Sequence, residues 1–138
     1  MATISNDPPA LTRNEERVLG ALRESGKPRK AYDILEELRP QGVKAPMTVY
    51  RALDGLTEKG LVHKLDTLNA YMLCEGDHAH RHASQVFVIC EICGDAREVE
   101  DCAVEARVKD VARTEGFSLV GARLEISGCC GDCRAAKA

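Results

Sequence analysis

Apolar residues in the first sixty positions repeat at helical spacing in three separate stretches, and each stretch ends near a glycine or a proline. Thr12 stands where a capping residue is expected, and Pro46 stands at a first helical position, where its missing N–H costs nothing. The apolar stripe of the third stretch is formed by Val49, Leu53 and Leu56. The pattern predicts helices over residues 12–25, 29–38 and 46–59.

The period of the pattern changes after Gly60. Residues 61–65 and 70–74 are predicted to be two strands, and the polar turn 66–69 lies between them. Three short helices followed by a β-hairpin is the element order of a winged helix-turn-helix domain. Another small α+β domain would share this order, and the pattern alone leaves that alternative open.

A polar stretch without periodicity, residues 75–84, follows the hairpin and is predicted to be a hinge or linker. Beyond it, a helix capped by Asp101 is predicted over residues 102–115. The apolar face of this helix, which we expect to be buried, carries Val104, Val108, Val111 and Ala112. Strands are predicted over residues 86–90, 97–100 and 117–126. The expected fold class is α+β, with an N-terminal winged-helix domain over 1–74 and a C-terminal α/β domain over 85–138.

The composition indicates an ordinary globular protein. Apolar residues make up 44% of the chain, which is enough for a packed core. Residues 1–9 show neither the basic nor the apolar stretch of a secretory signal, and no run approaches the roughly 18–20 apolar residues that cross a bilayer. We therefore expect a soluble, cytoplasmic protein that has no membrane partner.

Charge is distributed unevenly between the two halves. The net charge of −3 is unusual for a protein that binds nucleic acid. Residues 1–73 carry 11 Lys and Arg against 10 Asp and Glu, a net +1, whereas residues 74–138 carry 8 against 12, a net −4. This asymmetry permits nucleic-acid binding by the first half without demonstrating it.

Two Cys-x-x-Cys pairs are the strongest chemical signal in the sequence. The pairs are Cys90–Cys93 and Cys130–Cys133, and each follows a predicted strand. Each pair presents two thiolates from one tight turn, and two such turns complete a tetrahedral four-cysteine zinc site. A reducing cytosol disfavours disulfides, so we expect structural zinc in preference to a redox pair or free buried cysteines. Cys129 adjoins Cys130, but the spacing favours Cys130 as the ligand.

A second, looser set of metal-ligating residues surrounds the predicted linker. Its members are His63, Cys74, His78, His80, His82 and Glu98. A lone histidine is most often a surface or core residue, whereas four histidines near one cysteine favour a second metal site. Ligands drawn from the hairpin, the linker and the second domain suit a sensor, because filling the site changes how the parts are placed. A mixed nitrogen, sulfur and oxygen set with one thiolate favours Zn²⁺ over Fe²⁺.

The segment from Lys44 to Arg51 carries the third signal. Thr48, Tyr50 and Arg51 lie off the apolar stripe, near the start of the helix that a winged domain inserts into the major groove. Arginine pairs with guanine edges, and tyrosine contacts a thymine methyl group or a phosphate. Candidate phosphate contacts are Lys27, Arg29, Lys30, Lys44 and Lys64. A solvated basic face on an ordinary helical domain is the alternative that charge alone leaves open.

Taken together, these motifs resemble those of the ferric uptake regulator family, and specifically its zinc-uptake-regulator branch. The matching elements are Thr48-Val49-Tyr50-Arg51-Ala52-Leu53, Gly60-Leu61-Val62-His63-Lys64 and both cysteine pairs, and the resemblance spans residues 10 to 134. It implies that a regulatory zinc is held by His63, Cys74, His82 and Glu98, with His80 as the alternative linker ligand. It also implies a DNA contact from Tyr32.

The resemblance implies a zinc-responsive repressor that binds double-stranded operator DNA as a homodimer and represses zinc-uptake genes. One structural zinc and at least one regulatory zinc are expected per subunit, with residues 85–138 as the dimerisation domain. An iron- or peroxide-sensing regulator of the same family is one alternative, against which Cys74 argues. A zinc hydrolase is the other, but no motif places a general base beside an open metal position. We expect no enzyme activity and no small-molecule substrate, and no role is predicted for Cys102 or Cys129.

Overall fold

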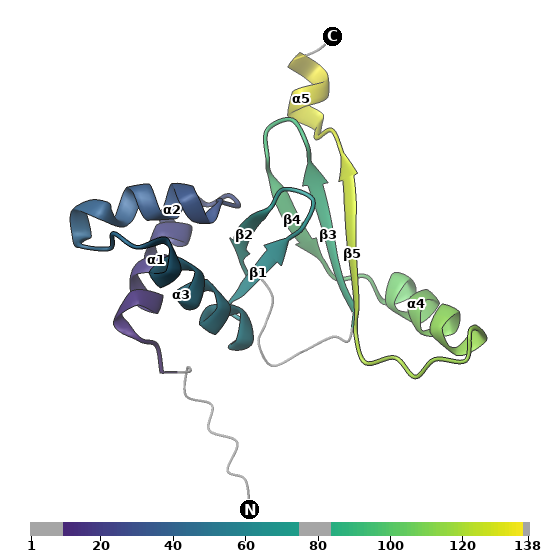
Figure 1. The fold of residues 1–138 in the computed structure, drawn as a ribbon. Coiled ribbons are helices and arrows are strands. Elements are labelled where there is room, and N and C mark those ends of the chain that lie inside the picture. Colours follow the sequence, from purple (N-terminus) through teal and green to yellow (C-terminus); the bar gives the residue numbers. More distant parts are fainter. Residues whose placement is uncertain (1–9, 75–83, 137–138) are drawn as a thin grey trace, which may run out of the picture.

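The computed structural model describes residues 10–74 and 84–136. Its N-terminal half is a helical unit followed by a hairpin (Figure 1). Its elements are α1 (Arg13–Ser25), α2 (Ala31–Leu38), the short 3-10 helix η1 (Arg39–Gln41), α3 (Pro46–Glu58), β1 (Val62–Leu65) and β2 (Ala70–Leu73). The β1–β2 hairpin is called the wing. The strands of the wing pair antiparallel, with Val62 opposite Leu73 and Leu65 opposite Ala70. The element order predicted for a winged helix-turn-helix is confirmed.

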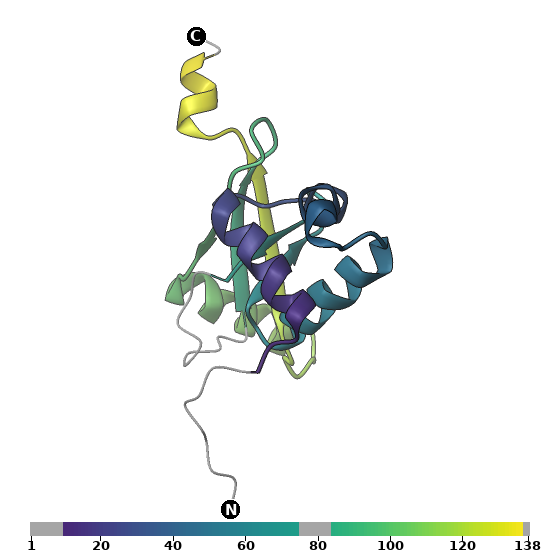
Figure 2. The same cartoon turned by 90° about the vertical axis from the view of Figure 1, so that its left-hand side faces the viewer.

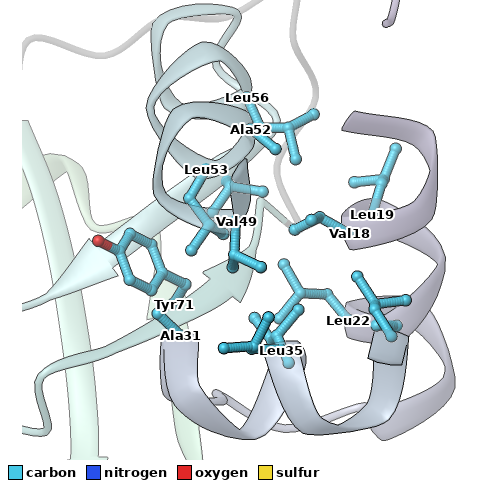
Figure 3. Packing of buried hydrophobic residues seen from close by; sticks show 14 of the residues in the cluster. Val18, Leu19, Leu22, Ala31, Leu35, Val49, Ala52, Leu53, Leu56 and Tyr71 are labelled. Carbon is cyan, nitrogen blue, oxygen red and sulfur yellow. The ribbon is translucent and has the colours of Figure 1, made fainter. Parts of the chain in front are cut away.

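The helices are held together by the apolar stripes that the sequence pattern predicts. Figure 3 shows side chains from α1, α2, α3 and Tyr71 of β2 gathered around a common centre. Leu22, Ile34 and Leu53 are almost fully buried there, and each such side chain stabilises the fold by roughly 1.5–3 kcal/mol. α1 begins with a reciprocal capping box. In it, Thr12 accepts a hydrogen bond from the Glu15 N–H and the Glu15 carboxylate accepts one from the Thr12 N–H.

The second helix starts later than predicted. The prediction began at residue 29, whereas α2 begins at Ala31. Arg29 instead forms a β-bridge with Tyr71 of β2, in which each residue donates its N–H to the carbonyl of the other at 2.8 Å. The segment before α2 is thereby tied to the wing, which a helical start at Arg29 would not allow.

The C-terminal half is a mixed sheet with a helical crossover. Its elements are β3 (Ser84–Cys90), β4 (Ala96–Val99), α4 (Cys102–Thr114), β5 (Ala122–Gly128) and α5 (Gly131–Ala136). The strand order is β4-β3-β5, in which β3 pairs antiparallel with β4 and parallel with β5. α4 connects β4 to β5, and Asp101 caps it by accepting hydrogen bonds from the N–H groups of Ala103 and Val104.

Two expectations for this half are wrong, and one helix was not predicted. The face of α4 that should be buried contains no buried residue, and Val111 is exposed. The last strand begins at Ala122, so Phe117 and Val120 precede it, and Val120 is 98% exposed. α5 has no counterpart among the predicted elements. Figures 1 and 2 show α4 standing beside the strands, and the described residues of the chain do not cover its apolar face.

The two halves meet where the wing lies on the sheet. Leu65 and Met72 of the wing share a second apolar cluster with Phe87, Ile89 and Ala96 of β3 and β4. All five side chains are buried, and Leu68 of the wing turn packs against them. This contact holds the wing across the face of the sheet. Within residues 10–74 and 84–136, no helix is both long and apolar enough to cross a membrane.

Candidate metal centres and nucleic-acid interface

Four cysteines lie together at the edge of the sheet where β3 and β5 both end. Cys90 ends β3 and Cys93 lies in the turn after it, while Cys130 and Cys133 flank the start of α5. The four Sγ atoms lie within 4.8 Å of one another. The Sγ atoms are 3.8 Å apart in the pair Cys90–Cys133 and in the pair Cys93–Cys130. A tetrahedral zinc with Zn–S bonds of about 2.3 Å requires sulfur separations of about 3.8 Å, so this donor set fits zinc.

The thiols of this group differ in acidity because of their surroundings. The N–H groups of Cys93 and Cys130 point at the Cys90 sulfur and lower the pKa of Cys90 to about 6. The hydrogen bond with Cys130, together with burial, raises the pKa of Cys133 well above its usual value. One thiolate is therefore favoured, but four at these separations repel one another. A bound dication offsets that repulsion.

The remaining cysteines of the C-terminal half lie outside this group. Cys129 directs its thiol to the carbonyl of Cys130 at 3.7 Å, and Cys102 is exposed at the start of α4. The structure brings Cys130 together with the other three cysteines, as the spacing favours, and leaves Cys129 beside them.

A second group of donors lies where the base of the wing meets β4. It comprises His63 of β1, Cys74 just after β2 and Glu98 of β4, whose donor atoms lie within 4.8 Å of one another. His63 Nε2 is 3.1 Å from Glu98 Oε2, and Cys74 Sγ is 3.8 Å from the same oxygen. The His63 ring is buried and packs edge-on against Phe87, with ring centroids 5.1 Å apart. The group therefore joins the two halves of the chain.

The donor chemistry of this second group fits a zinc ion that takes its remaining ligand from elsewhere. One imidazole, one thiol and one carboxylate make a mixed set, and four-coordinate zinc accepts all three. The resemblance described above implies a further ligand at His82, or alternatively at His80. These residues and His78 lie outside the described residues.

The candidate DNA contacts lie on exposed surfaces of the N-terminal half. Tyr50 and Arg51 are exposed on α3 and Thr48 is partly buried in its first turn. Tyr32, on the first turn of α2, is 67% exposed. The exposed lysines of the candidate set are Lys27, Lys30, Lys44 and Lys64. Arg29 is already engaged, because its guanidinium contacts the Glu37 carboxylate and the Asp33 carbonyl.

Sequence reasoning missed three features of these surfaces. Met47, next to Pro46, is 59% exposed on the same helix as Tyr50, and an apolar residue off the core stripe was the available signal. Glu15 of α1 pairs with Lys59, just after α3, and no local pattern indicates a contact between residues so far apart. Glu125 of β5 contacts the wing turn, and no local pattern announces a contact between residues so far apart.

The chain is similar in sequence to a family of known regulators. The model of the Ferric uptake regulator family matches residues 10–127. The Zinc uptake regulation protein of Escherichia coli is 42% identical over 106 residues, which is 75% of this chain and 60% of that protein. The chain therefore spans only about 60% of the length of that relative. The Zinc uptake regulation protein of Mycobacterium tuberculosis is 38% identical over 110 residues, which is 77% of this chain and 80% of that protein.

A solved structure titled as a zinc uptake regulator complexed with zinc and DNA is similar over most of its length. It has a TM-score of 0.85 and 35% identity, and the match covers 93% of this chain and 85% of the solved one. The arrangement of helices, wing and sheet is therefore shared with a protein that binds both zinc and DNA.

Proposed function

The chain belongs to the ferric uptake regulator family, in its zinc-uptake-regulator branch, and from this premise we propose that it is a zinc-responsive repressor of zinc-uptake genes. The observation that carries the proposal is the group His63, Cys74 and Glu98, which draws its donors from the wing and from β4. Such a group links metal occupancy to the placement of the DNA-binding half on the other half. Its thiol favours zinc over iron and peroxide sensing, which makes those alternatives less well supported.

We propose that residues 1–74 bind DNA, that residues 75–84, the last of which already begins β3, form the hinge and that residues 85–138 form the dimerisation domain. The N-terminal helices have an apolar core of their own, which supports a separate DNA-binding unit. The face of α4 that residues 10–74 and 84–136 leave uncovered and the exposed side chains of Phe117 and Ile126 support a homodimer, because a second copy would cover them.

The four-cysteine group is proposed to hold one structural zinc per subunit through Cys90, Cys93, Cys130 and Cys133. His63, Cys74 and Glu98, with His82 or His80, are proposed to hold at least one regulatory zinc. When bound, zinc would supply positive charge and fixed tetrahedral geometry at each group. The cysteines would then tie the turn after β3 to the segment after β5, and His63 and Cys74 would hold the base of the wing against Glu98.

The DNA interface is proposed to centre on α3. Thr48, Tyr50 and Arg51 would face base edges in the major groove, where Arg51 would pair with guanine. Tyr32, Lys44 and Lys64 would contact the backbone from either side, which their exposure supports. A homodimer would read two half-sites separated by about one helical turn, roughly 34 Å, or a multiple of it. We place this activity in the cytoplasm and assign no catalytic role to it.

Replacing Cys74 with serine tests the proposal. An alcohol is rarely ionised and binds zinc weakly, so Cys74→Ser should lose zinc-dependent operator binding at buffered free zinc near the wild-type midpoint. Cys102→Ser is the matched control, because Cys102 is exposed and lies outside both donor groups. Cys74→Ser should keep its structural zinc, its dimeric state and its non-specific DNA binding. A wild-type zinc response in Cys74→Ser would refute the regulatory assignment.

A further inference from the structure

The turn of the wing is fastened to β5 by a single carboxylate. Glu125 Oε2 accepts a hydrogen bond from the Asp66 N–H at 3.0 Å, and Oε1 accepts one from the Thr67 N–H at 2.8 Å. The Glu125 side chain is only 12% exposed. Two backbone donors on one ionised acceptor form a charge-assisted pair, which is stronger than a pair of neutral hydrogen bonds.

The surroundings of Glu125 keep it negatively charged. Burial by itself would raise the pKa of Glu125, but the hydrogen bonds from Thr67 and Asp66 and the nearby Arg123 guanidinium bring the pKa below its usual value. Arg123 Nε lies 3.8 Å from Glu125 Oε2, and its guanidinium also lies over the Phe87 ring at 5.3 Å. The contact is therefore part of the packed face of the sheet and not a loose surface pair.

Glu125 and the candidate metal ligand Glu98 lie in one row across the sheet. Phe87 of β3 pairs in register with Glu98 of β4 on one side and with Glu125 of β5 on the other. Glu98 meets the base of the wing through His63, while Glu125 meets its tip. The wing is thus held to the sheet at both ends, and only the base carries a group of metal donors among the described residues.

We propose that Glu125 is a positioning residue that docks the wing on the sheet without metal and so sets the free zinc concentration at which the chain binds DNA. The inference rests on the proposed function, because it requires that the docked arrangement is the one that holds zinc and binds operator DNA. The apparent affinity for a ligand scales with the fraction of molecules already in the competent arrangement. A contact that favours docking in the absence of zinc therefore lowers the zinc concentration required.

The variant Glu125→Gln weakens this contact with little change in size. A glutamine has one acceptor oxygen, and its NH₂ group would face one of the two N–H donors. In buffered zinc titrations on operator DNA, we expect the midpoint to move to about ten-fold higher free zinc, equivalent to about 1.4 kcal/mol. The affinity at saturating zinc should remain at the wild-type value. Glu115→Gln, which changes an exposed glutamate at the end of α4, should leave the midpoint unchanged.

Amide hydrogen exchange measured by NMR reads the contact directly. In zinc-free wild-type protein, the Asp66 and Thr67 amides should be protected, and in Glu125→Gln they should exchange faster while α1 and α3 keep their protection. Thr67→Pro deletes one of the two donors and leaves β5 untouched, so it should shift the zinc midpoint in the same direction. This second variant keeps the test decisive if Glu125→Gln does not fold.

Two results would overturn the inference. Equal amide exchange in the wild type and in Glu125→Gln would show that the carboxylate does not dock the wing. Faster exchange with an unchanged zinc midpoint would show that docking does not set the response. If wild-type DNA binding ignored zinc, the proposed function would fail and take the zinc part of the inference with it, while the exchange data would still decide the role of Glu125 in docking.

Discussion

Lys59, just after α3, reaches back to Glu15 on the first turn of α1, where its Nζ lies 2.6 Å and 2.8 Å from the two carboxylate oxygens. Glu15 is 4% exposed, so the carboxylate of this ion pair is buried away from water. The same carboxylate closes the capping box with Thr12. One side chain thus joins the start of α1 to the end of the proposed recognition helix.

Replacing Glu15 with glutamine should destabilise the chain at neutral pH by about 1–3 kcal/mol, because Lys59 loses its charged partner. The bond with Lys59 lowers the pKa of Glu15 below its usual value. A lowered folded-state pKa adds stability that is fully present above the unfolded-state pKa and is lost as the pH falls through the folded-state value. The difference in unfolding free energy between the wild type and Glu15→Gln should therefore shrink on acidification. A difference that stays constant down to pH 3 would contradict this assignment.

A side chain at Gly55 would crowd the Glu15 carboxylate, an effect that helix propensity does not predict. A Cβ added at Gly55 of α3 would lie 2.9 Å from Glu15 Oε2, whereas one added at Gly20 of α1 would meet nothing within 4 Å. Both glycines are inside helices, where alanine is normally favoured by about 1 kcal/mol. We expect Gly20→Ala to raise the midpoint of chemical unfolding and Gly55→Ala to lower it. Equal stabilisation by both would mean that the Glu15 carboxylate moves aside at no cost.

Loss of one ligand should dismantle the four-cysteine site. Cys93→Ser and Cys133→Ser should each bind one zinc fewer per chain and lose the dimer, because metal binding is coupled to folding. Cys129→Ser is the control, since Cys129 is adjacent in sequence but outside the group. Zinc content and sedimentation together give the answer. A folded dimer of Cys133→Ser with the wild-type zinc content would contradict the structural role.

Arg51 and Lys64 should contribute differently to DNA binding. Arg51→Ala should weaken operator binding by about 1–3 kcal/mol, with less effect on random DNA. Lys64→Ala should weaken binding to both and lower the slope of the salt dependence by about one. Parallel titrations on operator and scrambled duplexes at several salt concentrations separate these effects. Equal losses on both duplexes for Arg51→Ala would make it a phosphate contact.

Local sequence patterns predicted the helices and strands that depend mainly on residues near one another in the sequence. Helix periodicity located α1 and α3 closely, because their apolar stripes meet inside one chain. The same reasoning located α4 and its Asp101 cap, but the expected burial of its apolar face was wrong, since the described residues leave that face uncovered. It also failed for Phe117 and the start of β5, because apolar composition alone does not give a strand a neighbour to pair with.

In the candidate sites, too, local motifs could be predicted and contacts between distant residues could not. Each Cys-x-x-Cys pair is a local motif, so the sequence could indicate the four-cysteine group directly. Residue types alone gave a set of six candidate ligands that included Glu98, His63 and Cys74, and the resemblance to a family was needed to select among them, because 35 positions separate Glu98 from His63. The pairing of Glu125 with the wing turn, across 58 positions, had no sequence signal because backbone N–H groups donate the bonds.

The parallel pairing of β3 with β5 also dictates an order of events during synthesis. Cys90 and Cys93 leave the ribosome with β3, whereas Cys130 and Cys133 follow only after α4 and β5, and Cys93 and Cys130 are 37 positions apart. A nascent chain therefore presents half a metal site for the whole time that the crossover is being made. During that interval Cys90 lacks the Cys130 N–H, which is one of the groups that lower the pKa of Cys90 to about 6 in the folded chain. The four-cysteine group can therefore be completed only after β5 and the second pair of cysteines have been made.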